Sequence, residues 1–219
     1  TPMNAILGYA QILLRDKMLS EGQKHSVKTI SNSGNHLLGL INEILDISKI
    51  EAGKMELNQT NFDLQELLQG VIKMFVGPCE EKGLLLRLDV ESNSFPVFGD
   101  EGKVRQILIN LVGNAIKFTK DGEVSIRMVK DEKAIYRFIV RDTGIGMSSE
   151  DQKLVFKPFH QILDEQAKLG TGLGLAISKK QTELMNGELT LESELGKGSA
   201  FFLKLCLLPA KGDMSKRVN

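Results

Sequence analysis

The chain has 219 residues, enough for one large domain or for one domain with an appendage. Its 28 basic residues balance its 28 acidic residues, so the charge does not indicate a nucleic-acid or anionic membrane surface. No apolar run reaches the roughly 18 residues of a membrane span and no signal peptide opens the sequence, so we expect no direct membrane contact from this segment.

The cysteines and the first residue indicate the cellular compartment and whether the sequence is part of a longer chain. Cys79 and Cys206 lie far apart, without the spacing of a disulfide framework or a metal site. We therefore expect a reducing, cytoplasmic compartment, with attachment of a parent protein to a membrane left open. Because the sequence begins at Thr1 without a methionine, we interpret it as a piece of a longer chain.

Two helices are predicted first, at residues 2–18 and 21–52, joined by a turn at residues 19–22 into an antiparallel hairpin. The apolar stripe of the second helix consists of Val27, Ile30, Leu37, Leu38, Ile41, Ile44, Leu45 and Ile50. A hairpin alone cannot cover such a stripe, so we predict a homodimer in which two hairpins form a four-helix bundle. Packing of the hairpin on the rest of its own chain is the alternative.

The pattern changes after Gly53, which suits the end of the second helix. Further helices are expected at residues 62–79, 100–118 and 173–185. Strands are expected at residues 55–58, 84–90, 123–129, 134–140, 188–193 and 199–208. Helices mixed with a largely antiparallel sheet predict an α+β two-layer sandwich. We expect the hairpin at residues 1–53, the sandwich at 54–209 and a tail or linker at 210–219.

The helix expected at residues 100–118 carries polar groups through an apolar face. Asp100 is a plausible N-cap, and at about 100° per residue Asn110, Asn114 and Lys117 share one narrow stripe. Asparagine is a poor helix former and costly to bury, which favours a site that uses both amides. The alternative is that both amides are exposed or satisfied by local hydrogen bonds.

A first glycine motif, residues 142–146, follows the strand expected at 134–140. Its glycines permit a tight turn and close approach of a ligand. The carboxylate of Asp142 at the strand end can accept a hydrogen bond from an exocyclic amine such as that of adenine. Asp-Thr-Gly also occurs in aspartic proteases, but a single copy in a chain that is not all-β disfavours that class.

A second glycine-rich turn, residues 170–174, opens the last expected helix, where unpaired N–H groups and the helix dipole suit a phosphate. It lacks the context of a dinucleotide-binding fold and the Gly-Lys-Ser/Thr of a P-loop. Between the two glycine motifs, residues 156–159 are expected to form a hydrophobic anchor and residues 160–168 a mobile lid. Residues 196–201 form a turn into the last strand.

Five motifs resemble, in order and spacing, the N, G1, F, G2 and G3 boxes of sensor histidine kinases. They are residues 110–117, 142–146, 156–159, 170–174 and 196–198. The resemblance covers essentially the whole chain, because residues 1–53 are similar to the dimerisation and phosphotransfer hairpin. The run LDISKIEAGKMEL is similar to that of hybrid-type kinases. The resemblance implies a Bergerat-type (GHKL) ATP-binding fold, ATP and Mg²⁺ as cofactors, and a response-regulator receiver domain, separate or fused, as a partner.

The resemblance also implies roles for individual residues. Asn114 would coordinate Mg²⁺, with Asn110 and Lys117 holding phosphate or metal-bound water, and Asp142 would bind the adenine amine. The other nucleotide contacts it implies are Gly144, Gly146, Phe159, Lys168, Gly170, Thr171, Gly172, Leu173 and Gly174. Leu169 departs from the pattern, since many members carry another glycine there.

Asn110 separates two reaction types. In related gyrase and heat-shock-chaperone ATPases, the matching position is a glutamate that activates water, and an amide cannot serve as that base. We therefore expect γ-phosphoryl transfer to a side chain rather than efficient hydrolysis. The resemblance places the acceptor histidine four residues before Thr1, outside this chain, and makes Thr1 a position that orients water for dephosphorylation of a partner aspartate. None of His25, His36 and His160 matches the acceptor motif.

Our leading hypothesis is the core of a two-component sensor histidine kinase, which autophosphorylates on histidine and then passes the phosphoryl group to a receiver aspartate. A non-enzymatic alternative is a nucleotide-sensing module whose hairpin docks partners. A hydrolytic ATPase of the wider superfamily is the third possibility. Labelling of an upstream histidine separates the first from the second, and steady-state phosphate release would favour the third.

Overall fold

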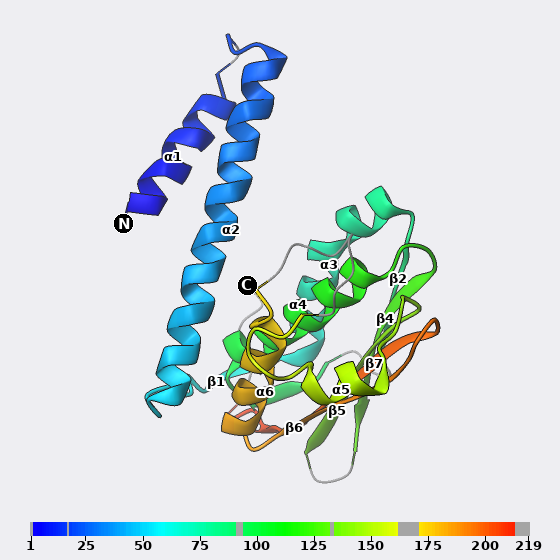
Figure 1. The fold of residues 1–219 in the computed structure, drawn as a ribbon. Helices are drawn as coiled ribbons and strands as arrows, with labels where there is room; N and C mark the ends of the chain where they lie inside the picture. The colour runs from blue at the N-terminus through cyan, green and yellow to red at the C-terminus, as the bar shows by residue number, and fades with distance from the viewer. Residues whose placement is uncertain (1, 17, 91–93, 132–133, 162–170, 213–219) are drawn as a thin grey trace. The chain divides into compact units, whose positions relative to one another are not determined.

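The computed structural model describes residues 2–16, 18–90, 94–131, 134–161 and 171–212. The chain divides into two compact units, residues 1–55 and 56–219 (Figure 1). The first unit is helical, and the second combines helices with two sheets.

The first unit is the predicted antiparallel helical hairpin of α1 (Pro2–Leu14) and α2 (Glu21–Glu51). Leu7 and Ala10 of α1 are buried against α2. Gly34 permits this approach, since a Cβ there would lie 2.9 Å from Cδ2 of Leu7. Helix α1 ends four residues earlier than predicted, in a turn where the carboxylate of Asp16 accepts a 2.8 Å bond from the backbone N–H of Met18.

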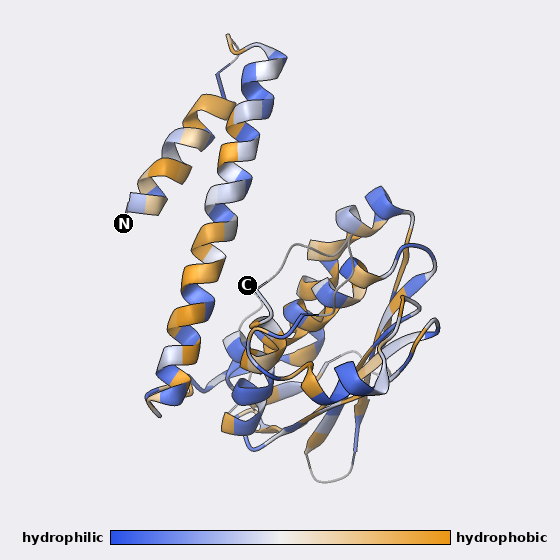
Figure 2. Cartoon of the chain, viewed as in Figure 1, coloured by the Kyte–Doolittle hydropathy of each residue, from blue (hydrophilic) through white to orange (hydrophobic). Residues whose placement is uncertain are grey.

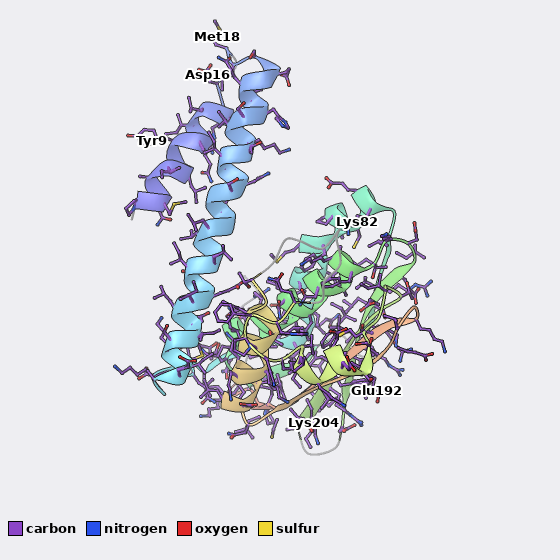
Figure 3. All side chains as sticks on the ribbon, in the orientation of Figure 1. Tyr9, Asp16, Met18, Lys82, Glu192 and Lys204 are labelled. Atoms are coloured by element: carbon purple, nitrogen blue, oxygen red, sulfur yellow. The ribbon has the colours of Figure 1, made fainter. Side chains whose placement is uncertain are left out.

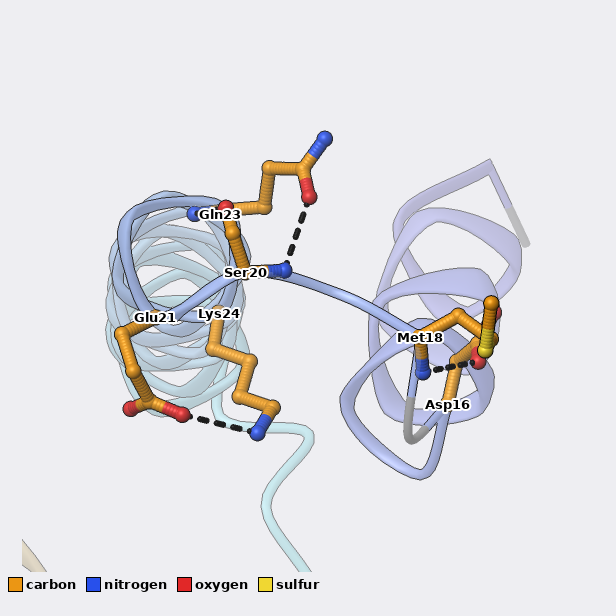
Figure 4. A network of polar contacts seen from close by, with 6 residues as sticks. All are labelled: Asp16, Met18, Ser20, Glu21, Gln23 and Lys24. Carbon is orange, nitrogen blue, oxygen red and sulfur yellow. Dashed lines mark hydrogen bonds and ion pairs between the residues drawn. The ribbon is translucent and has the colours of Figure 1, made fainter.

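Local hydrogen bonds define both ends of α2. Ser20 and Gln23 form a capping box. The Gln23 side chain accepts from the N–H of Ser20 (Figure 4), and the Ser20 hydroxyl accepts from the N–H of Gln23. Gly22 therefore lies inside the helix rather than in the predicted turn. At the other end, Gly53 adopts φ 64°, and the N–H of Lys54 bonds to the carbonyl of Lys49. This confirms the predicted helix stop.

A broad apolar face of the hairpin is exposed within this chain. Figure 2 shows apolar residues along both helices. The exposed apolar side chains are Ile6, Tyr9, Ile12, Leu13, Ile30, Leu37, Ile41, Ile44 and Leu45, which are between 39% and 70% exposed. Exposed apolar surface on this scale is typical of an interaction surface.

The second unit is the predicted α+β two-layer sandwich. Its five-stranded sheet has the order β2-β4-β5-β7-β6. The bounds are β2 Leu85–Val90, β4 Glu123–Lys130, β5 Ile135–Asp142, β6 Glu188–Glu194 and β7 Gly198–Cys206. Only β2 and β4 pair in parallel, and all other pairs in this sheet are antiparallel. Helices α3 (Leu64–Lys82), α4 (Glu101–Phe118) and α6 (Gly174–Leu184) cover one face of the sheet (Figure 1).

Alternation along the central strands builds the core. Tyr136, Phe138 and Val140 of β5 are buried, whereas Arg137 and Arg141, at alternate positions of the strand, are exposed. Helix α4 adds the other side of this core with seven buried apolar residues, Val104, Ile107, Leu108, Leu111, Val112, Ala115 and Ile116. The periods of two for strands and 3.6 for helices explain why most of these elements were predicted correctly.

Some short elements differ from the prediction. Residues 55–58 form no strand, and the strand lies instead at β1 (Thr60–Asp63). Asp63 then caps α3, because its Oδ1 accepts from the N–H of Gln65 at 2.7 Å, so Phe62 belongs to the strand rather than to the helix. Three short elements were not predicted from the sequence: β3 (Pro96–Gly99), α5 (Ser149–Leu154) and β8 (Leu208–Pro209).

Strands β1, β3 and β8 form a second, small sheet. It joins the two ends of the unit, since β8 pairs with β3. Beyond β8, Ala210 donates to the carbonyl of Pro96, and Lys211 and Asn61 exchange two hydrogen bonds. The second unit therefore includes the first residues of the predicted tail.

The Asp100 cap of α4 is confirmed, and its charge should contribute to stability. Oδ1 accepts from the N–H of Lys103, and Oδ2 accepts from the N–H of Asn58 and from Nζ of Lys103, at 2.9, 2.8 and 3.1 Å. Burial alone would raise the pKa of the carboxyl, but these bonds outweigh it and the pKa is lowered.

Asp100→Ala is expected to lower the free energy of unfolding by about 1 kcal/mol or more at pH 7, because α4 loses its cap. A carboxyl with a lowered pKa stabilises the fold above its ordinary pKa, and this contribution is lost as the pH falls through the lowered value. Urea unfolding of Asp100→Ala and Asp100→Asn from neutral to acidic pH measures both effects. A deficit of Asp100→Asn that did not shrink in acid would contradict the role of the charge.

Candidate functional site

The polar stripe of α4 lies against α6. Nδ2 of Asn110 donates to Oγ of Ser178 at 2.9 Å, and Nδ2 of Asn114 donates to Oδ1 of Asn110 at 3.4 Å. Both asparagines are partly buried, as is Lys117 one turn further on. The structure thus joins the two predicted amides in one hydrogen-bonded chain that begins on α6.

The C-terminal end of α4 is held by two groups from other segments. The ammonium of Lys82, at the end of α3 (Figure 3), donates to the carbonyl of Ile116 at 2.8 Å. The carbonyl of Phe118 accepts from the N–H of Ile145 at 3.2 Å, which ties the first glycine motif to the helix. Burial lowers the pKa of Lys117, because desolvation disfavours its charged form. A partly desolvated ammonium attracts an anion more strongly than a fully hydrated one.

Asp142 ends β5 and is only 5% exposed. Its Oδ1 accepts from the N–H of Gly144 at 2.8 Å and from the N–H of Ser199 at 3.2 Å. Burial raises the pKa of the carboxyl, and the two hydrogen bonds offset this effect only in part. Both of these donors reach the same oxygen, so the carboxylate is oriented by the backbone of two neighbouring segments.

The loop after Asp142 is packed against the turn between β6 and β7. Gly146 adopts φ 66°, and a Cβ there would collide with the carbonyl of Glu194. The N–H of Gly196 donates to the carbonyl of Ile145 at 2.7 Å. Gly144 similarly lies against the carbonyl of Phe118. These glycines therefore serve close contacts between protein segments, in addition to the ligand contacts that the sequence suggested.

The predicted anchor contacts the second glycine motif through the backbone. The N–H of Phe159 donates to the carbonyl of Gly172 at 3.0 Å. Phe159 is 71% exposed and has φ 63°, which is a strained conformation for an aromatic residue. Gly172 has φ 72°, and a Cβ on it would lie within 3.0 Å of the backbone of His160 and Phe159. Strain of this kind is often found at ligand sites.

Helix α6 begins at Gly174 directly beside Asn110. A Cβ on Gly174 would collide with Oδ1 of Asn110, so only glycine permits this contact. The N-cap residue, Leu173, supplies no side-chain cap, and its own side chain is buried. The N–H of Leu173 donates to Oγ1 of Thr171 at 3.0 Å. The first turn of α6 thus presents backbone donors without a side-chain cap, an arrangement suited to a phosphate.

The predicted site residues that the structure describes lie along α4, at the end of β5 and around the start of α6. The structure links Asn110 with Asn114 and Gly174, and Phe159 with Gly172. Thr1, Lys168 and Gly170 lie outside the described residues. Ser178 and Ser199 were not predicted as site residues, because their only signal in the sequence was their position on the same predicted elements as the glycine motifs.

The arrangement fits a nucleotide with a bound cation. A buried, oriented carboxylate suits the amine of a base, and the uncapped start of α6 beside Asn110 suits phosphates. Amide oxygens are suitable ligands for a hard cation such as Mg²⁺, which is usually held by few protein groups together with phosphate oxygens and water. The residues present therefore fit both ATP and Mg²⁺.

Comparison with known proteins gives the same result. Residues 99–209 match the family described as histidine kinase-, DNA gyrase B- and HSP90-like ATPase, and residues 1–53 match the His Kinase A (phospho-acceptor) domain. The chain belongs to this ATPase family. The two domains, in this order, make it the catalytic core of a sensor histidine kinase.

Similar proteins include sensor kinases. The chain is 42% identical to the sensor protein GacS of Pseudomonas syringae over 226 residues, covering 100% of this chain and 25% of that protein. It is 37% identical to the signal transduction histidine-protein kinase BarA of Escherichia coli, covering 94% of this chain and 23% of that protein. The chain thus spans about a quarter of the length of these relatives.

Two solved structures share the fold. Full-length ShkA in complex with AMPPNP has a TM-score of 0.80 and 34% identity, with coverage of 96% of this chain and 44% of that one. The Acinetobacter baumannii histidine kinase AdeS has a TM-score of 0.68 and 25% identity, with coverage of 94% and 95%.

Among the described residues, no helix is long and apolar enough to cross a membrane.

Asp142→Asn is expected to leave the nucleotide-free protein at least as stable as the unaltered one at pH 7. A raised pKa means that the folded state resists ionisation of Asp142, so the carboxyl stabilises the fold below its ordinary pKa and loses this contribution as the pH rises. In thermal unfolding from pH 4 to pH 8, the melting temperature of the variant should increase relative to that of the unaltered protein as the pH rises. A melting temperature of the variant that falls relative to that of the unaltered protein over this range would contradict the prediction.

Proposed function

We propose that this chain binds Mg-ATP and transfers the γ-phosphoryl group to a histidine upstream of Thr1, from which it passes to a receiver-domain aspartate. The observation that carries the proposal is the linked pair Asn110 and Asn114 beside the uncapped start of α6. The match to the phospho-acceptor domain and the similarity to named sensor kinases support kinase activity. We also propose a cytoplasmic location, where ATP is available.

Each group at the site has a proposed task. Asp142 accepts a hydrogen bond from the adenine amine, and Gly144 and Gly146 line the base pocket. Asn114 holds Mg²⁺, which would offset the negative charge of the phosphates. Asn110 and Lys117 hold phosphate or metal-bound water, with Lys117 contributing a partly desolvated positive charge. The remaining proposed contacts are Phe159, Lys168, Gly170, Thr171, Gly172, Leu173 and Gly174.

Asn110 favours phosphoryl transfer over hydrolysis. A neutral amide cannot remove a proton from water, so the site has no general base at this position. Both atoms of the Asn110 amide also form hydrogen bonds within the protein, the nitrogen with Ser178 and the oxygen with Asn114. Water that enters the site is therefore not activated there, and the bound nucleotide persists until an acceptor side chain arrives.

Incubation with γ-labelled Mg-ATP tests the proposal in a protein extended upstream through the expected histidine. Label that is stable in base and labile in acid is expected on the extended protein and absent from residues 1–219. Asp142→Asn should abolish labelling, because an amide at this position offers a donor where the adenine amine needs an acceptor. Nucleotide binding without label on the extended protein would favour the nucleotide-sensing module, and steady phosphate release would favour the hydrolase.

The pH dependence of nucleotide affinity gives a second test of Asp142. Only the ionised carboxylate is expected to bind the adenine amine strongly, and its pKa is raised by burial. Affinity for ADP should therefore begin to fall at a pH above the ordinary range of an aspartate, with a loss of up to tenfold per pH unit below the raised pKa. Calorimetric titration with ADP between pH 4 and pH 8 measures this. An affinity that is independent of pH over this range would contradict the assignment.

We further propose that the exposed apolar face of the hairpin forms the homodimer, in keeping with the phospho-acceptor domain match. Ile44→Glu places a charge in this face and should convert dimer to monomer, measured by sedimentation equilibrium. Asn32→Glu is the matched control, because at 100° per residue Asn32 lies on the opposite side of α2. Equal dimerisation of both variants would contradict the proposed interface.

A further inference from the structure

The contact between α4 and α6 contains a ladder of polar side chains, of which the two on α6 are buried. Nε2 of Gln181 donates to Oε1 of Gln106 at 2.8 Å, and one turn further along Nδ2 of Asn110 donates to Oγ of Ser178 at 2.9 Å. Ser178 is 2% exposed and Gln181 is 1% exposed. The paired residues are four apart on α4 and three apart on α6, and their order along α6 is the reverse of that along α4. The two bonds therefore define the register of the two helices.

Such a ladder costs stability relative to apolar packing. Burying hydroxyl and amide groups is unfavourable unless each finds a partner, and the net gain from each bond is only about 1 kcal/mol. Oε1 of Gln181 is buried and has no hydrogen-bond partner among the described residues. Replacing both partners of a buried hydrogen bond by apolar groups of the same shape can be neutral or stabilising. Stability alone therefore does not explain the ladder.

Ser178 engages the amide nitrogen of Asn110. With Nδ2 engaged by Ser178, Oδ1 of Asn110 faces the Nδ2 of Asn114 at 3.4 Å. Gly174 leaves room for the same oxygen, since a Cβ on Gly174 would collide with Oδ1 of Asn110. Because Asn114 uses its nitrogen toward Asn110, its oxygen is the atom turned away from Asn110. A hard cation requires that oxygen rather than the nitrogen.

We propose that Ser178 is a positioning residue, whose hydroxyl sets the amide orientation of Asn110 and through it presents the oxygen of Asn114 to the cation of a bound Mg-nucleotide. This inference rests on the proposed function, in which Asn114 holds the metal. Hydrogen-bond partners that orient metal ligands typically change metal affinity by roughly 10–100-fold.

Ser178→Ala removes the hydroxyl, leaves Nδ2 of Asn110 without this acceptor and lets the amide rotate. We expect the affinity for Mg-AMPPNP to fall about tenfold, while the affinity for ADP without Mg²⁺ changes less than about twofold, as measured by calorimetry. The ratio of the two affinities separates an effect on the metal from general damage to the site, because Asp142 recognises both nucleotides.

Thr182→Val is the matched control. Thr182 is fully buried one turn along the same helix, and its hydroxyl donates only to the carbonyl of Ser178 in its own backbone, at 2.7 Å. The change also removes one buried hydroxyl, so it should alter thermal stability without changing the ratio of the two affinities. Equal ratios for Ser178→Ala and Thr182→Val would overturn the proposal.

A double substitution tests whether Ser178 acts through Asn110. In the background of Asn110→Ala, adding Ser178→Ala should leave the affinity ratio unchanged, because the amide to be oriented is absent. Independent, multiplying effects of the two changes would overturn the proposal.

A measurement without nucleotide keeps this test separate from the proposed function. In the unaltered protein, one side-chain amide proton of Asn110 should show the slow solvent exchange and small temperature coefficient of a hydrogen-bonded proton by NMR. Ser178→Ala should abolish this protection, and Thr182→Val should retain it. An unprotected Asn110 amide in the unaltered protein overturns the positioning role. Protection of the amide together with a complete lack of nucleotide binding would instead defeat the proposed function.

Discussion

The position of the site depends on the burial of one side of α4. Seven apolar side chains of this helix lie in the core, and a helix presents each face in a fixed direction relative to the others. Once that side packs on the sheet and on α3, the stripe of Asn110, Asn114 and Lys117 can only lie along the side that meets α6. Lys82 and Ile145 hold the end of the helix, so the stripe is also fixed along its axis.

The site is assembled from groups that do not favour stability. Asp142 is buried with a raised pKa, and Phe159 has a strained backbone. The polar ladder between α4 and α6 replaces what could have been apolar packing. Large apolar layers elsewhere in the second unit offset these costs. Residues that oppose local stability are typical of a binding site.

Local sequence patterns predicted much of this architecture. Helix α4, its Asp100 cap and its polar stripe follow from spacing within 19 residues, and the alternation of β4 and β5 is equally local. The short elements β1, β3, α5 and β8 escaped prediction, because four residues or fewer in a strand, or six in a helix, show too little periodicity. β3 also opens with a proline, which argues against a strand at first sight.

The sequence by itself determined which chemical groups are available and how neighbouring groups are spaced: two amides four residues apart on a helix, a carboxylate at a strand end, and glycines before a helix. Only the tertiary structure decided which atoms meet. Asn110 and Ser178 are 68 residues apart in the chain, and Asp142 and Ser199 are 57 apart. Their contacts depend on how α4, α6 and the sheet pack together, and helical or strand periodicity carries no information about the distance or rotation between two elements.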